Sequence, residues 1–107
     1  MSTQLASRTV CIIGLGQVGM PTAEYVKRRE LTTFGYDINR EAVLLAKSKG
    51  IIATTRFQEL PHDIDVYMVC VSTLVNGMVP NLSPVFDVCE KIAQREHIPS
   101  LVSIEST

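Results

Sequence analysis

The chain has 107 residues, of which 46% are hydrophobic, and its formal net charge is −1. This length and apolar content fit one small domain with its own core, and a charge so close to zero excludes the basic surface that nucleic acid or an anionic membrane requires. No apolar run approaches the roughly 18 residues of a membrane-spanning helix, and the polar stretch Met1–Ser7 is too short for a signal peptide. We therefore expect a cytoplasmic protein without a nucleic-acid or membrane partner.

An apolar, β-branched run at Thr9–Ile13 is typical of a strand buried on both faces. It leads directly into the sequence Gly14-Leu-Gly16-Gln-Val-Gly19, after which apolar residues recur at helical spacing over about Gln17–Glu30. Gly14 permits a tight turn, Gly16 lets a pyrophosphate approach the backbone, and Gly19 lets the helix pack closely on the sheet. This turn is therefore a candidate phosphate-binding loop.

The first predicted helix presents an apolar stripe of Val18, Thr22, Ala23 and Val26, and Pro21 is expected to distort its start. The next apolar run, 32–36, predicts a second strand.

Asp37 follows that second strand directly. An acidic residue there can accept hydrogen bonds from a ribose, so strand, glycine turn, helix and aspartate together form a dinucleotide-binding fingerprint. The alternative is a tight strand-to-helix turn that binds nothing, but that interpretation gives Asp37 no role.

The rest of the chain continues to alternate. We expect a helix over Arg40–Lys49, capped by Asn39 and ended by Gly50, and then a strand at Ile51–Ala53. An irregular link over Thr54–Asp63, with a capping box of Thr55 and Gln58, leads to a strand at Asp65–Val71 and a loop over Leu74–Leu82 that turns at Asn76-Gly77. The last two expected elements are a helix with Ser83 as N-cap and Pro84 as its first residue, and a strand at Leu101–Ile104. The last helix is expected to bury a stripe of Val85, Val88, Cys89, Ile92 and Ala93.

This alternation predicts an α/β fold, a doubly wound parallel sheet of the Rossmann type with about five strands in the order 3-2-1-4-5, truncated after the fifth. Ligands of such sheets bind outside the carboxyl ends, where strands one and four part. Ser72-Thr73 and Ser106-Thr107 follow two strands at that edge, and their hydroxyls serve either as turn residues or as ligands of a cofactor.

The cysteines and histidines indicate no further chemistry. Cys11, Cys70 and Cys89 are odd in number and widely spaced, without a Cys-x-x-Cys pair or a cluster with histidine. No metal site is predicted, and buried free thiols in a reducing compartment are expected. His62 in a loop is expected to be exposed rather than catalytic, and His97 at a helix tail is expected to be partly exposed with a capping role.

Five segments together resemble the N-terminal cofactor domain of the UDP-glucose/GDP-mannose dehydrogenase family. They are residues 13–21, 35–39, 69–73, 80–85 and 103–107. The proline two residues after Gly19 and the terminal Glu-Ser-Thr are its most specific parts. The chain departs from the family at Ser72, where proline is common, and in a shorter segment before the fourth strand.

The resemblance implies a two-domain homo-oligomeric enzyme that oxidises the C6 alcohol of a UDP-sugar or of GDP-mannose to a carboxylate with two NAD. It also implies three sets of cofactor contacts. The pyrophosphate is held by Gly14, Leu15, Gly16, Gln17, Val18 and Gly19, the adenosine ribose by Asp37, and the dinucleotide is lined by Val71, Ser72 and Thr73. Thr107 matches a threonine that positions a catalytic water or a proton-transfer network. The family's catalytic cysteine and its substrate-binding domain lie in a later region, so the 107 residues are expected to bind NAD without turning over substrate.

Two other interpretations stay open. The 3-hydroxyisobutyrate dehydrogenase group shares the first strand, turn and helix, although it typically carries methionine where Val18 stands. A non-enzymatic NAD-sensing module would use the same phosphate cradle. The sequence identifies neither the sugar nor the oligomeric state.

Overall fold

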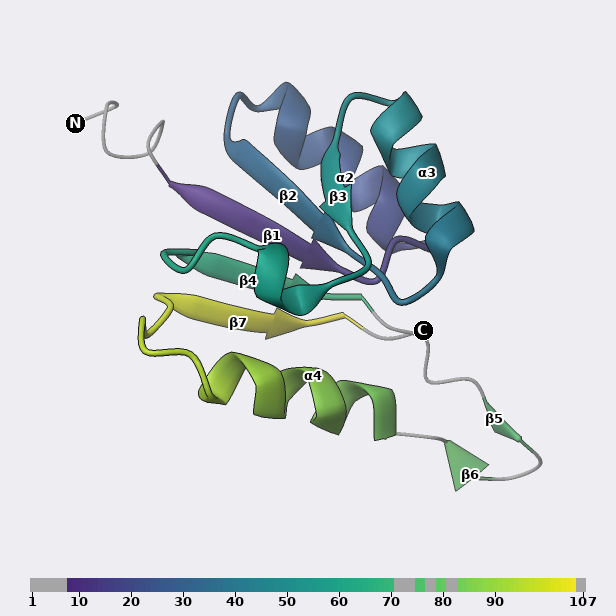
Figure 1. The fold of residues 1–107 in the computed structure, drawn as a ribbon. Helices are drawn as coiled ribbons and strands as arrows, with labels where there is room; N and C mark the ends of the chain where they lie inside the picture. Colours follow the sequence, from purple (N-terminus) through teal and green to yellow (C-terminus); the bar gives the residue numbers. More distant parts are fainter. Residues whose placement is uncertain (1–7, 71–74, 77–78, 81–82, 106–107) are drawn as a thin grey trace.

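The computed structural model describes residues 8–70, 75–76, 79–80 and 83–105. Its elements in chain order are β1 (Thr9–Ile13), α2 (Gly19–Arg28), β2 (Thr32–Tyr36), α3 (Arg40–Ser48), β3 (Ile52–Thr54), the 3-10 turn η1 (Phe57–Glu59), β4 (Val66–Val69), β5 (Val75–Asn76), β6 (Val79–Pro80), α4 (Ser83–Ala93) and β7 (Leu101–Ile104) (Figure 1). Within these ranges no helix is long and apolar enough to cross a membrane.

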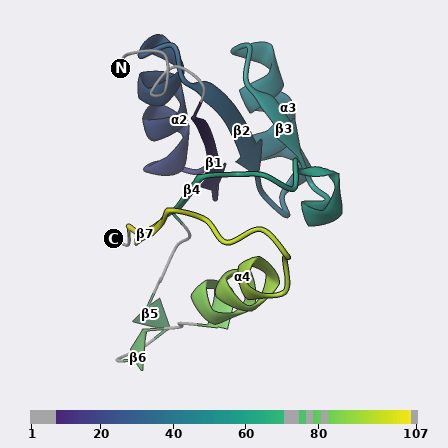
Figure 2. The same ribbon diagram turned by 90° about the vertical axis from the view of Figure 1, so that its left-hand side faces the viewer.

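Five parallel strands form one sheet in the order β3-β2-β1-β4-β7. Helices α2 and α3 cover one face, whereas α4 and η1 cover the other (Figures 1 and 2). This confirms the predicted doubly wound α/β fold and its strand order. The carboxyl ends of β1 and β4 lie side by side, so the predicted crevice opens between the glycine turn and α4.

The central strands are buried on both faces because alternate residues enter two separate cores. From β1, Val10 and Ile12 pack beneath α2 and α3, whereas Cys11 and Ile13 pack beneath α4 and η1. The helix and turn residues buried in the two cores are Met20, Ala23, Val26, Val43 and Ala46 on the first side and Phe57, Val88 and Ile92 on the second.

The three cysteines are free thiols, as predicted. Cys11 and Cys70 are buried, and Cys89 is half-buried. Desolvation raises the pKa of the Cys11 thiol far above its usual range, although the charge of Arg95 acts in the opposite direction. Cys11 is therefore a packing residue rather than a nucleophile.

Helix α3 confirms its predicted start and stop. The Asn39 side chain accepts a hydrogen bond from the Glu41 N–H at 2.8 Å, and Gly50 adopts a φ of 83° after the last turn. Helix α2 begins at Gly19 rather than near Gln17, since the glycine turn occupies the residues between. Its buried stripe includes Met20, which the sequence analysis missed, and Val18 is only partly buried.

The predicted capping box of Thr55 and Gln58 is wrong. The turn η1 has Arg56 as its N-cap and no side-chain capping hydrogen bond. Thr54 organises this link instead, because its hydroxyl accepts from the Arg56 N–H at 3.0 Å and donates to the Glu59 carboxylate.

Strand β4 is shorter than the predicted 65–71. Asp65 precedes the strand, although its N–H donates to the Thr9 carbonyl oxygen at 3.0 Å and its carboxylate accepts from the Thr9 N–H at 3.0 Å. Strand β3 begins one residue later than predicted, after Ile51. The buried side chain of Ile51 joins the first core.

The segment expected to be a loop over 74–82 contains the short antiparallel pair β5 and β6. Gly77, half of the predicted turn centre, lies outside the described residues. Helix α4 includes Ser83 rather than beginning after it, and Ala93 is exposed instead of completing the apolar stripe. A stripe of three buried residues, Val85, Val88 and Ile92, is enough to seat α4 on the sheet.

Candidate cofactor site

The turn between β1 and α2 requires glycine at two positions. Gly14 has a φ of 92°, and its N–H donates to the Tyr36 carbonyl oxygen at 2.7 Å, which ties the turn to the end of β2. A Cβ added at Gly19 would lie 1.6 Å from the Gly14 carbonyl oxygen. Gly14 therefore permits the tight turn and Gly19 the close approach of the helix, as the sequence predicts.

Gly16 is different, because a Cβ added there would meet no atom within 4 Å. Its backbone borders a cavity of about 600 Å³ at the carboxyl ends of the strands. The space that a side chain would fill is thus the space that a phosphate group needs. The geometry at Gly16 fits a dinucleotide.

The first helical turn of α2 leaves backbone donors available. Val18 is the N-cap and makes no side-chain capping hydrogen bond, and the first turn contains no acidic residue. Within the described part of the chain, the N–H groups of Gln17 and Val18 have no acceptor, although both residues line the cavity. Free donors and the positive end of the helix dipole favour an anion at this place.

Asp37 joins the glycine turn to the start of α3. Its carboxylate accepts hydrogen bonds from the Leu15 N–H at 2.7 Å and from the Asn39 N–H at 2.8 Å, one on each oxygen. The side chain is half-buried and lines the same cavity. Since each carboxylate oxygen can accept a second hydrogen bond, Asp37 can still receive two ribose hydroxyls.

The predicted cofactor residues fall into three groups. Those that line the cavity are Gly14, Gly16, Gln17, Val18 and Asp37. Leu15 contributes its N–H to Asp37 while its side chain is buried against Gly35, and Gly19 is buried under the turn. Val71, Ser72 and Thr73 lie outside the described residues, as does Thr107, the residue predicted to act in catalysis.

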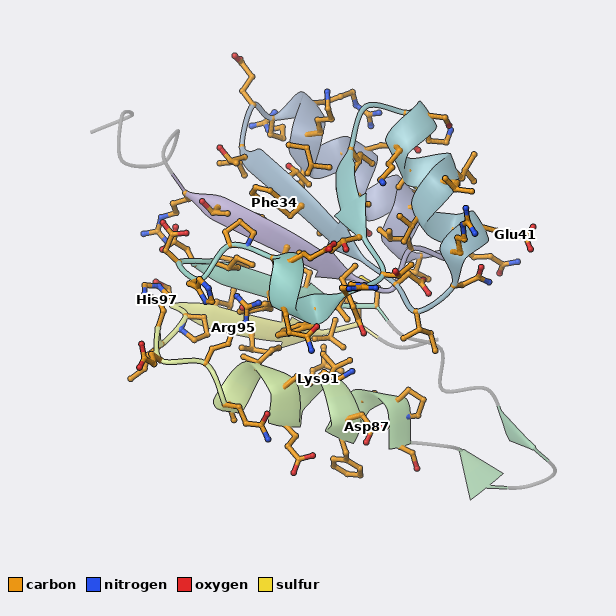
Figure 3. All side chains as sticks on the ribbon, in the orientation of Figure 1. Phe34, Glu41, Asp87, Lys91, Arg95 and His97 are labelled. Atoms are coloured by element: carbon orange, nitrogen blue, oxygen red, sulfur yellow. The ribbon has the colours of Figure 1, made fainter. Side chains whose placement is uncertain are left out.

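The opposite wall of the cavity was missed by the sequence analysis. It consists of Pro84, Asp87, Val88 and Lys91 from α4, with Cys70 and Glu105 between the walls. Figure 3 shows Lys91 on the side of α4 that faces the sheet, and Asp87 one helical turn before it. Asp87 and Lys91 are four residues apart in the helix and flank its apolar stripe, and this spacing is the sequence signal that both belong to one polar face beside the buried one.

Cys70 and Glu105 follow β4 and β7 at the floor of this crevice. Burial, with a further contribution from the Glu105 charge, raises the pKa of the Cys70 thiol. A protonated thiol here is a neutral lining group, and the negative charge of the floor comes from Glu105.

A second cavity of about 750 Å³ lies between η1 and the end of α4. The Arg95 guanidinium donates there to the Phe57, Leu60 and Pro61 carbonyl oxygens and lies 4.6 Å from the centroid of the Phe57 ring. Arg95 thus holds the link against α4. His62 and His97 line this cavity and are exposed, and the described residues contain no cluster of three His, Cys, Asp or Glu side chains that could hold a metal ion.

With this geometry established, the comparisons with known proteins decide the family. Residues 9–97 match the family described as the NAD binding domain of 6-phosphogluconate dehydrogenase. The chain belongs to this family of NAD-binding domains. NAD is therefore the cofactor of the domain, and the cavity between the glycine turn and α4 is the place where the residues fit it.

Individual relatives are nucleotide-sugar dehydrogenases. The UDP-N-acetyl-D-mannosamine dehydrogenase of Campylobacter jejuni is 30% identical over 92% of this chain and 28% of its own length. The NDP-N-acetyl-D-galactosaminuronic acid dehydrogenase of Ralstonia nicotianae is 30% identical over 94% and 28%. The solved UDP-D-ManNAc dehydrogenase of Pyrococcus horikoshii superposes with a TM-score of 0.77 at 27% identity, over 92% and 28%.

These relatives confirm the resemblance to the cofactor domain of nucleotide-sugar dehydrogenases. The chain spans less than a third of the length of each of the three.

Proposed function

We propose that the chain is the NAD-binding domain of a nucleotide-sugar 6-dehydrogenase. Such an enzyme oxidises the C6 alcohol of a UDP-sugar, or of GDP-mannose, to a carboxylate with two NAD. The names of the relatives from Campylobacter jejuni and Ralstonia nicotianae support this substrate class. In this proposal the sugar nucleotide binds to a second domain outside the 107 residues, and the complete protein is a cytoplasmic homo-oligomer.

The observation that carries the proposal is the joint placement of Gly16, Asp37 and the start of α2 around one cavity. The free N–H groups of Gln17 and Val18 hold the pyrophosphate, and the Asp37 carboxylate orients the adenosine ribose. Bound NAD supplies the acceptor for the hydride that leaves the sugar carbon. The residues of this chain therefore bind and orient the dinucleotide.

Four residues outside the described ranges complete the proposed site. Val71, Ser72 and Thr73 follow β4 and line the dinucleotide. Thr107 follows β7, where its hydroxyl, which can both donate and accept a proton, takes part in the proton-transfer network of the reaction. Thr107→Ala in a protein that contains both domains should lower kcat by roughly ten- to a thousandfold while the Kd for NAD changes little.

Calorimetric titration of NAD tests the site. The chain should bind NAD, and Gly16→Val should abolish binding without lowering the melting temperature, because the new side chain enters open space rather than the core. Unchanged binding by the variant would show that the phosphate cradle is elsewhere.

The substrate class is tested in a longer protein that contains both domains. NAD reduction is measured with UDP-N-acetylmannosamine and, separately, with 3-hydroxyisobutyrate, and activity with the hydroxy acid alone would reject the proposal.

A further inference from the structure

Lys91 lies on the wall of the cofactor cavity that α4 provides, opposite the glycine turn. Among the described residues that line this cavity it is the one with a positive charge, whereas Asp37, Asp87 and Glu105 are acidic. The pyrophosphate of a dinucleotide brings two further negative charges into the same space. An ammonium group on this wall therefore has a clear electrostatic role in admitting the ligand.

The ammonium group is only weakly held by the protein. Its nitrogen lies 3.4 Å from the Tyr36 hydroxyl oxygen, which is long for a hydrogen bond, and 5.7 Å from the centroid of the Tyr36 ring. The ion pair found in the described part of the chain joins Lys49 to Glu24, so Lys91 forms none there. With three N–H donors and at most one in use, Lys91 keeps two for a ligand.

Tyr36 fixes which end of the dinucleotide Lys91 would meet. Tyr36 directly precedes Asp37, the residue proposed to bind the adenosine ribose, and it lines the cofactor cavity together with Lys91. Both residues also line the second cavity, so the ammonium lies on the boundary between the two spaces. With Asp37 at the ribose, as proposed above, this is the adenosine side of the crevice.

We propose that Lys91 is a cofactor-binding residue that donates hydrogen bonds, from α4, to the ADP half of the dinucleotide. The proposal rests on the cofactor role proposed above for the glycine turn and Asp37. It adds a charged contact from the wall opposite the phosphate-binding loop, so that the ligand is held from both sides of the crevice.

The test compares Lys91→Met with two reference variants. Lys91→Arg keeps the charge, and Lys47→Met removes a charge that is also exposed, from α3 and outside both cavities. NAD, ADP and nicotinamide mononucleotide are titrated by calorimetry at about 0.02 M and about 0.3 M salt. Melting temperatures should agree among all four proteins, since neither lysine is buried.

Lys91→Met should weaken the binding of NAD and of ADP by roughly three- to tenfold at low salt. It should also reduce the salt dependence of both affinities and leave the weak binding of the mononucleotide unchanged. Lys91→Arg and Lys47→Met should bind like the parent. If Lys91→Met keeps the parental affinity for NAD and ADP while Gly16→Val loses it, the role of Lys91 is overturned and the cofactor site stands; if Gly16→Val also keeps its affinity, the site itself is wrong.

Discussion

The starts of helices α2 and α3 lie at the same edge of the sheet, and each follows a parallel strand. They differ in whether the chain itself supplies a capping group for the free backbone N–H groups of the first turn. The start of α3 is satisfied by its own chain, with the Asn39 side chain on the Glu41 N–H and an acidic residue in the first turn. The start of α2 has no capping side chain and no acid. Val18, the N-cap of α2, lines the cavity with Gly16, whereas Asn39, the N-cap of α3, is not among the described residues that line it. A missing cap beside open space is therefore what the proposed phosphate site requires at the start of α2.

Gly19→Ala should have the largest effect, since it attacks the close approach on which the start of α2 depends. A Cβ at this position meets the Gly14 carbonyl oxygen at 1.6 Å, and backbone cannot move aside cheaply. We expect a loss of about 3 kcal/mol or more in the free energy of unfolding, measured by urea denaturation. Gly16→Ala is the control, with a change within about 0.5 kcal/mol; equal stability of the two variants would contradict this packing.

Val18→Asp should make the start of α2 resemble that of α3, with an acidic group where the phosphates are proposed to bind. The repulsion should weaken NAD binding roughly tenfold or more at low salt, and less at high salt. Val18→Asn controls for the lost packing of a partly buried side chain. If the aspartate and asparagine variants bind NAD equally, the anion does not lie at this helix start.

Asn39→Ala should have the smallest effect and should leave the cofactor site intact. Loss of the hydrogen bond to the Glu41 N–H is expected to cost about 1 kcal/mol of stability, visible as a lower melting temperature. The Asn39 N–H that donates to Asp37 is retained, so the Kd for NAD should stay within about twofold. Asn39→Asp, which keeps an acceptor oxygen, should restore the stability, and a large loss of NAD affinity in Asn39→Ala would show that the two helix starts are coupled.

The sequence predicts the strand order and the glycine turn well, because strands buried on both faces, helical spacing and special backbone angles are local signals. The wall formed by Asp87 and Lys91 is not predictable in the same way. Which side of α4 meets the crevice depends on how Val85, Val88 and Ile92 seat the helix, and that is a property of the assembled core. The prediction of Thr55 as the residue that organises the turn η1 failed for a similar reason. Which threonine makes these hydrogen bonds depends on where β3 ends, and the strand ends at Thr54.

The hydrogen bond between the Asp37 carboxylate and the Leu15 N–H has a consequence for the redesign of this domain. A cofactor-switching programme would replace Asp37 to admit a dinucleotide with an extra phosphate. The same replacement removes the brace between the end of β2 and the loop that receives the pyrophosphate. Selectivity and loop shape are thus coupled through one side chain, and a successful variant must bring a new acceptor for Leu15 as well as a new partner for the ligand.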